Sequence, residues 1–301
     1  MEEYLKIKSD FDGLQLDVLL EIPEKVKGIV QIAHGMAEYK ERYLGFMKFL
    51  CANGYVACIN DHRGHGNSVK DPKDLGYFYD KTGKAIVDDV HQITLYLKER
   101  FPNVPVILFG HSMGSFVVRA YTRLYDKDID KLVVCGSPSY NSAAKVGVGL
   151  IDFLIALKGE RNISKMMVNM ATGGYDKPYA AEGHNAWLSV NKENVEKYNN
   201  DPKCGFPFTL NGYRNLMVLM QDAYAKDGWK LNNKDLPVLF ISGSGDPCAE
   251  SKEKWQEAIA DMKSHGYNNV TGKMYEGYRH EILLDDCKEE VMKDVLEFIN
   301  K

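Results

Sequence analysis

The sequence predicts an α/β fold in which a mostly parallel central sheet is flanked by helices and interrupted by a helical insertion. Short apolar runs rich in β-branched residues alternate with longer amphipathic stretches between residues 28 and 137. This alternation stops after Pro138 and resumes near residue 232. The apolar runs are nearly continuous, as is typical of parallel strands that are covered by helices on both faces.

The composition is that of a globular chain large enough to bury a substantial core. Its 301 residues are 45% apolar and 27% charged, with a net charge of −4 and no basic run. A nucleic-acid partner is therefore not expected. The first ten residues lack the basic start and the apolar run of a secretory signal. No apolar stretch reaches the roughly 18 residues of a membrane span, so a cytoplasmic location is expected.

The six cysteines have no Cys-x-x-Cys spacing, which favours reduced thiols over a disulfide framework or a zinc site.

The elements follow in order along the chain. Segments 3–9 and 14–23 flank the turn Asp-Phe-Asp-Gly and predict an antiparallel hairpin at the edge of the sheet. The apolar runs that follow predict parallel strands at 28–34, 55–61, 104–110 and 131–137. The amphipathic stretches between them predict helices at 42–54, 82–101 and 114–127.

Residues 139–231 contain helical stretches and turn clusters but no convincing strand. After them, the pattern predicts a strand within 236–247, a helix at 251–266, a strand at 270–277 and a final helix at 288–300. The simplest division is a core domain made of residues 1–138 and 232–301, with residues 139–231 as a helical insertion.

A Gly-x-Ser-x-Gly pentapeptide, residues 110–114, joins a predicted strand to a predicted helix. A serine hydroxyl is a weak nucleophile that must project clear of the backbone, and a sharp strand-to-helix turn provides that exposure. Gly110 and Gly114 keep the crowded flanks of the turn small. The turn also directs the amide of Met113 into the helix start, which favours an oxyanion. Ser112 is therefore predicted to be a nucleophile, and the alternative is that it only caps the helix.

The base and the acid are expected to follow the serine in the order acid, then histidine. His280 lies between the last predicted strand and the last helix, whereas His265 ends a helix, where a capping role is expected. Asp246 follows the strand before, and its alternative role is an Asp-Pro turn. The loop after 131–137 offers no carboxylate, so Asp246 is favoured as the group that orients His280.

Two loops complete the predicted site. The loop after the first parallel strand reads "AHGMAEYKERY", so the backbone N–H of Met36 is the expected second oxyanion donor. The segment "NDHRGHGNS" contains His62 and His65, but no third ligand has a suitable spacing for a metal site. That segment is expected to be a loop packed beside the site, and His184 is expected to be a surface or lid residue.

Six segments together resemble the monoacylglycerol lipase and lysophospholipase group of α/β-hydrolases, which are serine esterases with a helical cap. They read "AHGMAEYKERY", "NDHRGHGNS", "FGHSMGS", "WLSVNKENVEKYNNDPKCGF", "SGSGDP" and "RHEIL". The resemblance implies a triad of Ser112, Asp246 and His280, an oxyanion hole formed by Met36 and Met113, and a cap over an acyl pocket. The sequence departs from the family pattern at Tyr39 of the first segment, where relatives often have histidine. This difference affects only the polar contacts expected near the loop after the first parallel strand.

The predicted function is hydrolysis of single-chain carboxylic esters, such as monoacylglycerols or lysophospholipids, through an acyl-enzyme. No metal or organic cofactor is needed for this chemistry. The alternatives are a peptidase or thioesterase on the same triad, because a fold and a triad do not fix the leaving group, and a non-catalytic binding protein with a hydrolase shell.

Within the predicted cap, apolar residues nearly encircle a helix at 145–159. One interpretation is a helix packed onto the main domain, and the other is that part of it faces an acyl chain or touches a membrane surface. Five methionines of the cap could be either core or pocket lining, namely Met166, Met167, Met170, Met217 and Met220.

Overall fold

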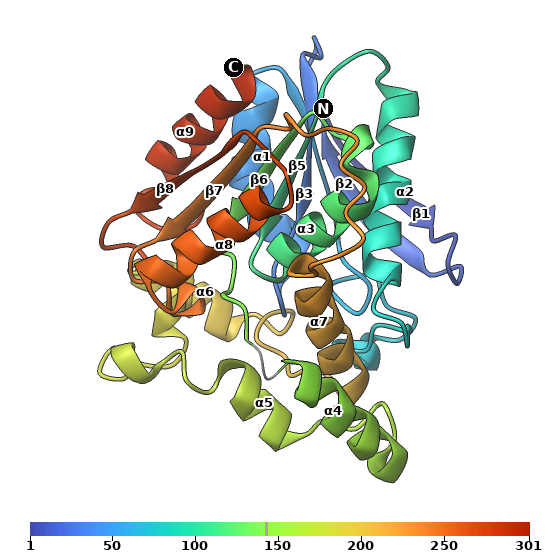
Figure 1. Ribbon diagram of the computed structural model, residues 1–301, viewed down its shortest axis with the longest axis vertical. Helices are drawn as coiled ribbons and strands as arrows, with labels where there is room; N and C mark the ends of the chain where they lie inside the picture. Colours follow the sequence, from blue (N-terminus) through green and yellow to red (C-terminus); the bar gives the residue numbers. More distant parts are fainter. Residues whose placement is uncertain (142–143) are drawn as a thin grey trace.

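A computed structural model describes residues 1–141 and 144–301, without the side chains of residues 144 and 145. Its centre is an eight-stranded sheet in the order β1-β2-β4-β3-β5-β6-β7-β8 (Figure 1). The first two strands form an antiparallel hairpin, β2 is antiparallel to β4, and all further neighbours are parallel. The predicted α/β architecture with an antiparallel hairpin at the sheet edge is confirmed.

The strands lie where the apolar runs predict them. They are β1 (Glu2–Lys8), β2 (Gln15–Glu21), β3 (Gly28–Ala33), β4 (Tyr55–Asn60), β5 (Val106–His111), β6 (Lys131–Cys135), β7 (Val238–Gly243) and β8 (Val270–Tyr275). β6 ends two residues before the predicted boundary, because Gly136 turns the chain away with a φ of +55°.

Helices cover both faces of the sheet. The helices of the sheet region are α1 (Leu44–Ala52), α2 (Ala85–Arg100), α3 (Met113–Tyr125), α8 (Lys252–Ser264) and α9 (Lys288–Asn300). α1 and α9 pack on one face, and α2, α3 and α8 pack on the other (Figure 1). Successive strand residues alternate between the two cores, so that Val106 and Leu108 join one and Ile107 and Phe109 join the other. This two-sided burial explains why the strands read as continuous apolar runs.

A helical segment lies between β6 and β7. Its helices are α4 (Ala144–Lys158), α5 (Lys165–Thr172), α6 (Lys192–Asn200) and α7 (Leu210–Ala223), with short 3-10 turns at Lys177–Tyr179 and Ala186–Leu188. They gather at one end of the sheet, in the lower part of Figure 1, and α7 packs against both α3 and α4. The described residues of 139–231 form no strand.

The helix predicted at 145–159 corresponds to α4, and its apolar residues divide between two environments. Ile151 is fully buried, and Leu154 and Ile155 pack against the core. Phe153 and Leu157 are 60% and 64% exposed. The buried face packs against α7 of the same segment, so packing accounts for only one face of this helix. Across the described residues, no helix is long and apolar enough to cross a membrane.

Candidate active site

Ser112 lies at the sharp turn between β5 and α3. Its backbone has φ +54° and ψ −118°, a conformation that L-residues rarely adopt. A Cβ at Gly110 would lie 2.3 Å from the carbonyl oxygen of Gly114, and one at Gly114 would lie 2.0 Å from that of Ala33. Glycine at both positions therefore lets β3, β5 and α3 approach closely enough to form the turn.

The start of α3 presents backbone donors beside the serine. Met113 is the first residue of this helix, where amide groups have no partner within the helix. The amide of Ser112 donates to the carbonyl of Cys135 at 3.0 Å, which ties the turn to the end of β6. The geometry suits a group that develops negative charge beside this helix start.

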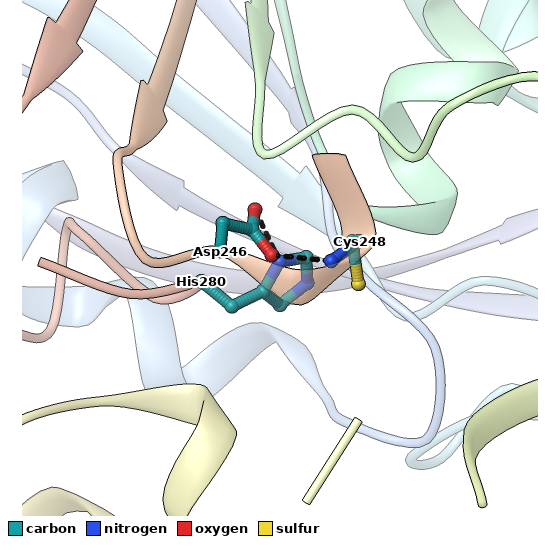
Figure 2. A group of neighbouring side chains, drawn as sticks. All are labelled: Asp246, Cys248 and His280. Carbon is teal, nitrogen blue, oxygen red and sulfur yellow. Dashed lines mark hydrogen bonds and ion pairs between the residues drawn. The ribbon is translucent and has the colours of Figure 1, made fainter. Parts of the chain in front are cut away.

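His280 and Asp246 come together from the loops after β8 and β7 (Figure 2). His280 Nδ1 lies 2.9 Å from Asp246 Oδ2, and both side chains are buried. Asp246 lies three residues beyond the end of β7, and its Oδ1 accepts the backbone N–H of Cys248 at 2.9 Å. The Asp-Pro turn and the contact with His280 therefore use different oxygens of the same carboxylate.

The Asp246 carboxylate changes the acidity of the histidine. Burial alone would lower the pKa of His280, because it disfavours the charged imidazolium. The charge and hydrogen bond of Asp246 outweigh this desolvation and raise the pKa of His280 above its usual value. An imidazole held in this way is a stronger base than a free one.

The loop after β3 reaches the same place. His34 Nδ1 contacts the carbonyl of Gly35 at 2.8 Å, and its Nε2 accepts the backbone N–H of His62 at 2.9 Å, so His34 shapes the turn. Ala37 has a φ of +51°, which strains the loop. Met36 and Met113 both line the cavity that contains Ser112.

A cavity of about 680 Å³ lies between the sheet end and the helical segment. Ser112 and His280 line it together with apolar side chains of the segment, among them Val168, Phe206, Tyr213, Leu216, Met217 and Met220. Four of the five methionines take one of the two expected roles, because Met167 is fully buried in the core whereas Met170, Met217 and Met220 line the cavity. Met166 takes neither role, since it is 44% exposed and does not line the cavity. The cavity can hold a largely apolar small molecule against Ser112.

Residues 24–287 match the family described as serine aminopeptidase, S33. The chain belongs to this family. The mouse monoglyceride lipase is 27% identical over 283 residues, which cover 91% of this chain and 81% of the lipase. The Mycolicibacterium smegmatis monoacylglycerol lipase is 25% identical over 279 residues, covering 91% and 88%.

The structure of a highly thermostable carboxyl esterase from Bacillus coagulans, solved in complex with glycerol, is similar to that of the present chain over nearly the full length of both proteins. The TM-score is 0.90 at 26% identity, and the match covers 99% of this chain and 98% of the esterase. The predicted resemblance to the monoacylglycerol lipase and lysophospholipase group, with the α/β-hydrolase fold, is confirmed. The prediction of a carboxylic-ester hydrolase agrees with the names of these relatives.

Metal-ligating residues come close together at one place in the described part of this hydrolase. Asp246, Cys248 and His280 have ligand atoms within 4.8 Å of one another (Figure 2). The hydrogen bond between His280 Nδ1 and Asp246 Oδ2 already occupies one possible ligand atom of each of these two side chains. All six cysteines are free thiols, and five of them are buried.

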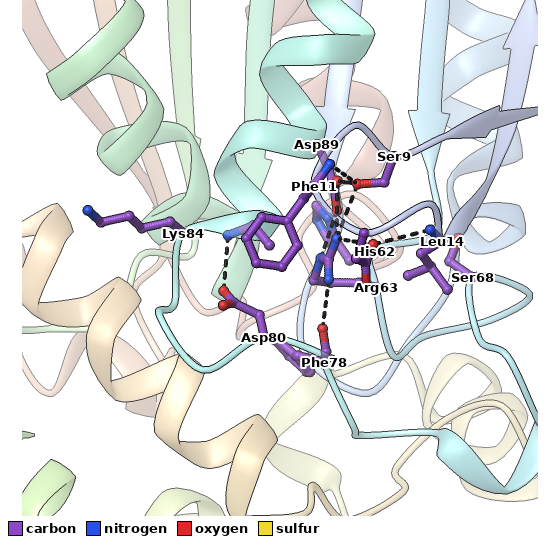
Figure 3. Close-up of polar contacts among 12 residues, drawn as sticks. Ser9, Phe11, Leu14, His62, Arg63, Ser68, Phe78, Asp80, Lys84 and Asp89 are labelled. Carbon is purple, nitrogen blue, oxygen red and sulfur yellow. Dashed lines mark hydrogen bonds and ion pairs between the residues drawn. The ribbon is translucent and has the colours of Figure 1, made fainter.

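The "NDHRGHGNS" segment of the hydrolase packs as a structural loop. Arg63 is fully buried, and its guanidinium donates to Asp89 at 2.8 Å and to the carbonyl of Phe78 at 2.9 Å (Figure 3). His62 and His65 are buried beside it, and burial lowers the pKa of both histidines.

His184, by contrast, is exposed at the cavity and contacts Asp176 at 3.3 Å. His265 ends α8, as expected, and stacks on Trp229.

Contacts that sequence reasoning missed connect the site loops of the hydrolase to the helical segment. Trp187 packs against the ring of His280 with centroids 4.9 Å apart. Arg279 donates to the carbonyl of Ala186 at 2.6 Å. Tyr39, in the loop after β3, donates from its hydroxyl to Asp201 at 2.6 Å. These partners are too far apart in the sequence for spacing to reveal them.

Proposed function

We propose that this protein is a serine hydrolase that cleaves carboxylic esters of single acyl chains, such as monoacylglycerols or lysophospholipids. The observation that carries the proposal is that Ser112, at its sharp turn, and His280, backed by Asp246, line one predominantly apolar cavity. A nucleophile, a base and an orienting carboxylate are the groups that acyl transfer requires.

In this proposal, His280 takes the proton of Ser112 as the serine oxygen attacks the ester carbonyl. Its Nδ1 faces Asp246, so Nε2 is the ring nitrogen that receives the proton. The carbonyl oxygen becomes an oxyanion, which accepts hydrogen bonds from the amides of Met36 and Met113. The C–O bond to the alcohol then breaks and His280 protonates the leaving oxygen, after which a water molecule activated by His280 hydrolyses the acyl-enzyme.

We assign residues 139–231 as the cap over this site and the remainder as the core. The helical segment supplies much of the apolar lining, including Met217 and Met220 of α7. A cavity of about 680 Å³ is in the range of sites that enclose a small ligand. Flexible methionine side chains can adapt to acyl chains of different shape.

The exposed face of α4 and α5 is the surface that we assign to contact with lipid. Its large apolar residues, together with Ile163 of the loop between the two helices, are each between 44% and 76% exposed; the full set is Val146, Phe153, Leu157, Ile163, Met166 and Met170. Ile163 and Met170 also line the cavity, so this apolar surface continues into the site. Exposed apolar patches of this kind mark interaction surfaces.

A peptidase is the second candidate, because the family that matches is described as a serine aminopeptidase. The same triad can attack an amide or an ester, and the two functions differ in the leaving group that the site accommodates. The predominantly apolar lining of the cavity favours an acyl chain.

The test is hydrolysis of p-nitrophenyl esters from acetate to palmitate, together with monoacylglycerol, lysophosphatidylcholine and aminoacyl p-nitroanilides. Ser112→Ala provides the blank. We expect serine-dependent activity with an optimum on medium or long acyl esters. Activity on the anilides alone would establish the peptidase, and ester hydrolysis that persists in Ser112→Ala would refute the proposed nucleophile.

A further inference from the structure

The loop after β3 is held by one of its own side chains. Glu38 Oε1 accepts the backbone N–H of Gly35 at 2.5 Å, and the hydroxyl of Tyr43 lies 2.9 Å from the same oxygen. A Cβ at Gly35 would itself lie 2.5 Å from this oxygen. Glycine at position 35 therefore permits the carboxylate to fold back onto the loop that contains Met36.

This carboxylate belongs to a buried ion-pair network. Arg42 Nη1 lies 2.6 Å from Glu38 Oε2, and the Arg42 guanidinium donates two hydrogen bonds to the Glu281 carboxylate at 2.7 and 2.8 Å. The three side chains are at most 9% exposed. Burial would raise the pKa of Glu38, but Arg42 and His111 outweigh this effect and hold that pKa well below its usual range. Glu38 is therefore ionised, and its amide contact is a charge-assisted hydrogen bond.

The same network reaches the loop of the proposed base. Glu281 follows His280 directly in the chain. On the other side, Tyr43 Oη lies 2.9 Å from His111 Nδ1, and His111 Nε2 lies 3.2 Å from the carbonyl oxygen of His280. A carbonyl can only accept, so Nε2 of His111 carries the hydrogen of this bond. Two separate routes thus connect Glu38 to the backbone around His280.

We propose that Glu38 is a positioning residue, which aligns the Gly35–Met36 segment for oxyanion binding and connects that segment to the His280 loop through Arg42 and Tyr43. This inference rests on the proposed function, in which the amide of Met36 is an oxyanion donor. Its physical basis is that an oxyanion hole works only when its donors are held in place before charge develops. The next residue, Ala37, is held at its carbonyl, which accepts the backbone N–H of Gly205 at 2.9 Å and the hydroxyl of Tyr198 at 3.2 Å, whereas Glu38 holds the amide of Gly35.

Glu38 also lines the cavity, so the test must separate positioning from contact with substrate. The experiment measures kcat and KM for Glu38→Ala and Glu38→Gln on a p-nitrophenyl ester, which has no glycerol group, and on a monoacylglycerol. Long incubation with a fluorophosphonate counts the active sites, and thermal unfolding checks the fold. Ser112→Ala, measured in parallel, tests the proposed function independently.

We expect Glu38→Ala to lower kcat about 100-fold on both substrates, with KM changed less than about threefold, because one oxyanion donor contributes about this much. Glu38→Gln keeps an oxygen acceptor for Gly35 and is expected to recover activity to within about tenfold of the parent protein. Glu281→Ala is the matched control, since it removes a carboxylate from Arg42 and leaves the Gly35 contact intact. Its loss in kcat should be at least about tenfold smaller than that of Glu38→Ala.

Three results would overturn the inference while Ser112→Ala remains inactive. They are an unchanged kcat in folded Glu38→Ala, a loss confined to KM on the monoacylglycerol, and equal losses in Glu38→Ala and Glu281→Ala. If Glu38→Ala does not fold, Tyr43→Phe replaces it, because this change removes only the hydroxyl next to Glu38. An unchanged kcat in Tyr43→Phe would then also overturn the inference.

Discussion

The imidazole of His280 is held between a carboxylate and an indole. Its Nδ1 lies 2.9 Å from Asp246 Oδ2 in a hydrogen bond. Trp187 of the helical segment packs against the ring, with 4.9 Å between the ring centroids. The ring is almost fully buried. Such contacts restrict rotation about both side-chain torsions, so the orientation of this histidine is set before a substrate enters.

Asp246→Asn tests this arrangement through the pH dependence of activity. A base must be neutral, so kcat/KM should fall on the acid side as pH drops through the raised pKa of His280. Removing the Asp246 charge lowers that pKa and should move the acid limb to lower pH. We also expect kcat to fall by about 10⁴, because the amide cannot hold the required tautomer.

The measurement for Asp246→Asn is a pH–rate profile on a p-nitrophenyl ester, with Asp235→Asn as the control. Asp235 follows the helical segment, lies outside the cavity and contacts Asn268 at 2.9 Å, so its variant should retain the parent profile. Near-normal activity in Asp246→Asn would show that another group orients His280.

Individual residues of the proposed triad were predictable because each stands at the end of a recognisable element. Ser112 follows β5, Asp246 follows β7 and His280 follows β8. The Glu38 network was not predictable, because Glu38, His111 and Glu281 meet only in the folded chain. Only the four-residue spacing of Glu38 and Arg42 was visible in the sequence, and such pairs are also common on exposed helices.

At the scale of elements, the junction of β5 and α3 depends on two glycines. In Gly114→Ala, the new methyl group would lie 2.0 Å from the carbonyl oxygen of Ala33, so β3 and α3 would have to separate. We expect a loss of about 3 kcal/mol or more in the free energy of unfolding. Gly45→Ala in α1 is the control, because nothing lies within 4 Å and alanine should stabilise the helix by up to about 1 kcal/mol. Urea unfolding of both variants measures the contrast, and equal stabilities would contradict it.

The loop between β4 and α2 depends on Arg63. This buried guanidinium pairs with Asp89 of α2 and also donates to the loop carbonyl of Phe78. Arg63→Ala leaves the Asp89 charge buried without its main partner, and we expect a loss of about 3–5 kcal/mol. Lys254→Ala, which removes an exposed pair with Glu257, should change stability by less than about 1 kcal/mol. Chemical unfolding followed by circular dichroism checks both values, and a small loss for Arg63→Ala would show that the loop relaxes around Asp89.

Element prediction succeeded where one physical pattern dominates. The central strands were recognisable because burial on both faces leaves them mostly apolar, as in Ile29, Val30 and Ile32 of β3. Helix α4 was recognisable as a helix, but its apolar residues gave no indication that Phe153 is exposed whereas Ile151 is buried. That division depends on which face α7 covers, and tertiary packing decides this.

At the scale of the whole molecule, the exposed apolar face of α4 and α5 predicts attachment to lipid vesicles. The double variant Phe153→Ser with Leu157→Ser should weaken vesicle binding at least tenfold, because each buried side chain of this kind contributes about 1.5–3 kcal/mol. Leu95→Ser on α2 is the control, since Leu95 is 47% exposed but lies outside the helical segment. Co-sedimentation with vesicles gives the comparison, and equal binding of the parent and the double variant would refute lipid contact through this face.

The position of the helical segment also has a consequence during synthesis. The proposed nucleophile and both oxyanion donors precede β7, whereas the proposed acid and base follow it. A chain emerging from the ribosome therefore exposes its serine turn and apolar helices long before Asp246 and His280 exist to activate the serine. In the proposed mechanism, hydrolysis can begin only when β7 and β8 have joined the sheet beside β6, so catalytic competence is acquired only after β8 has been synthesised.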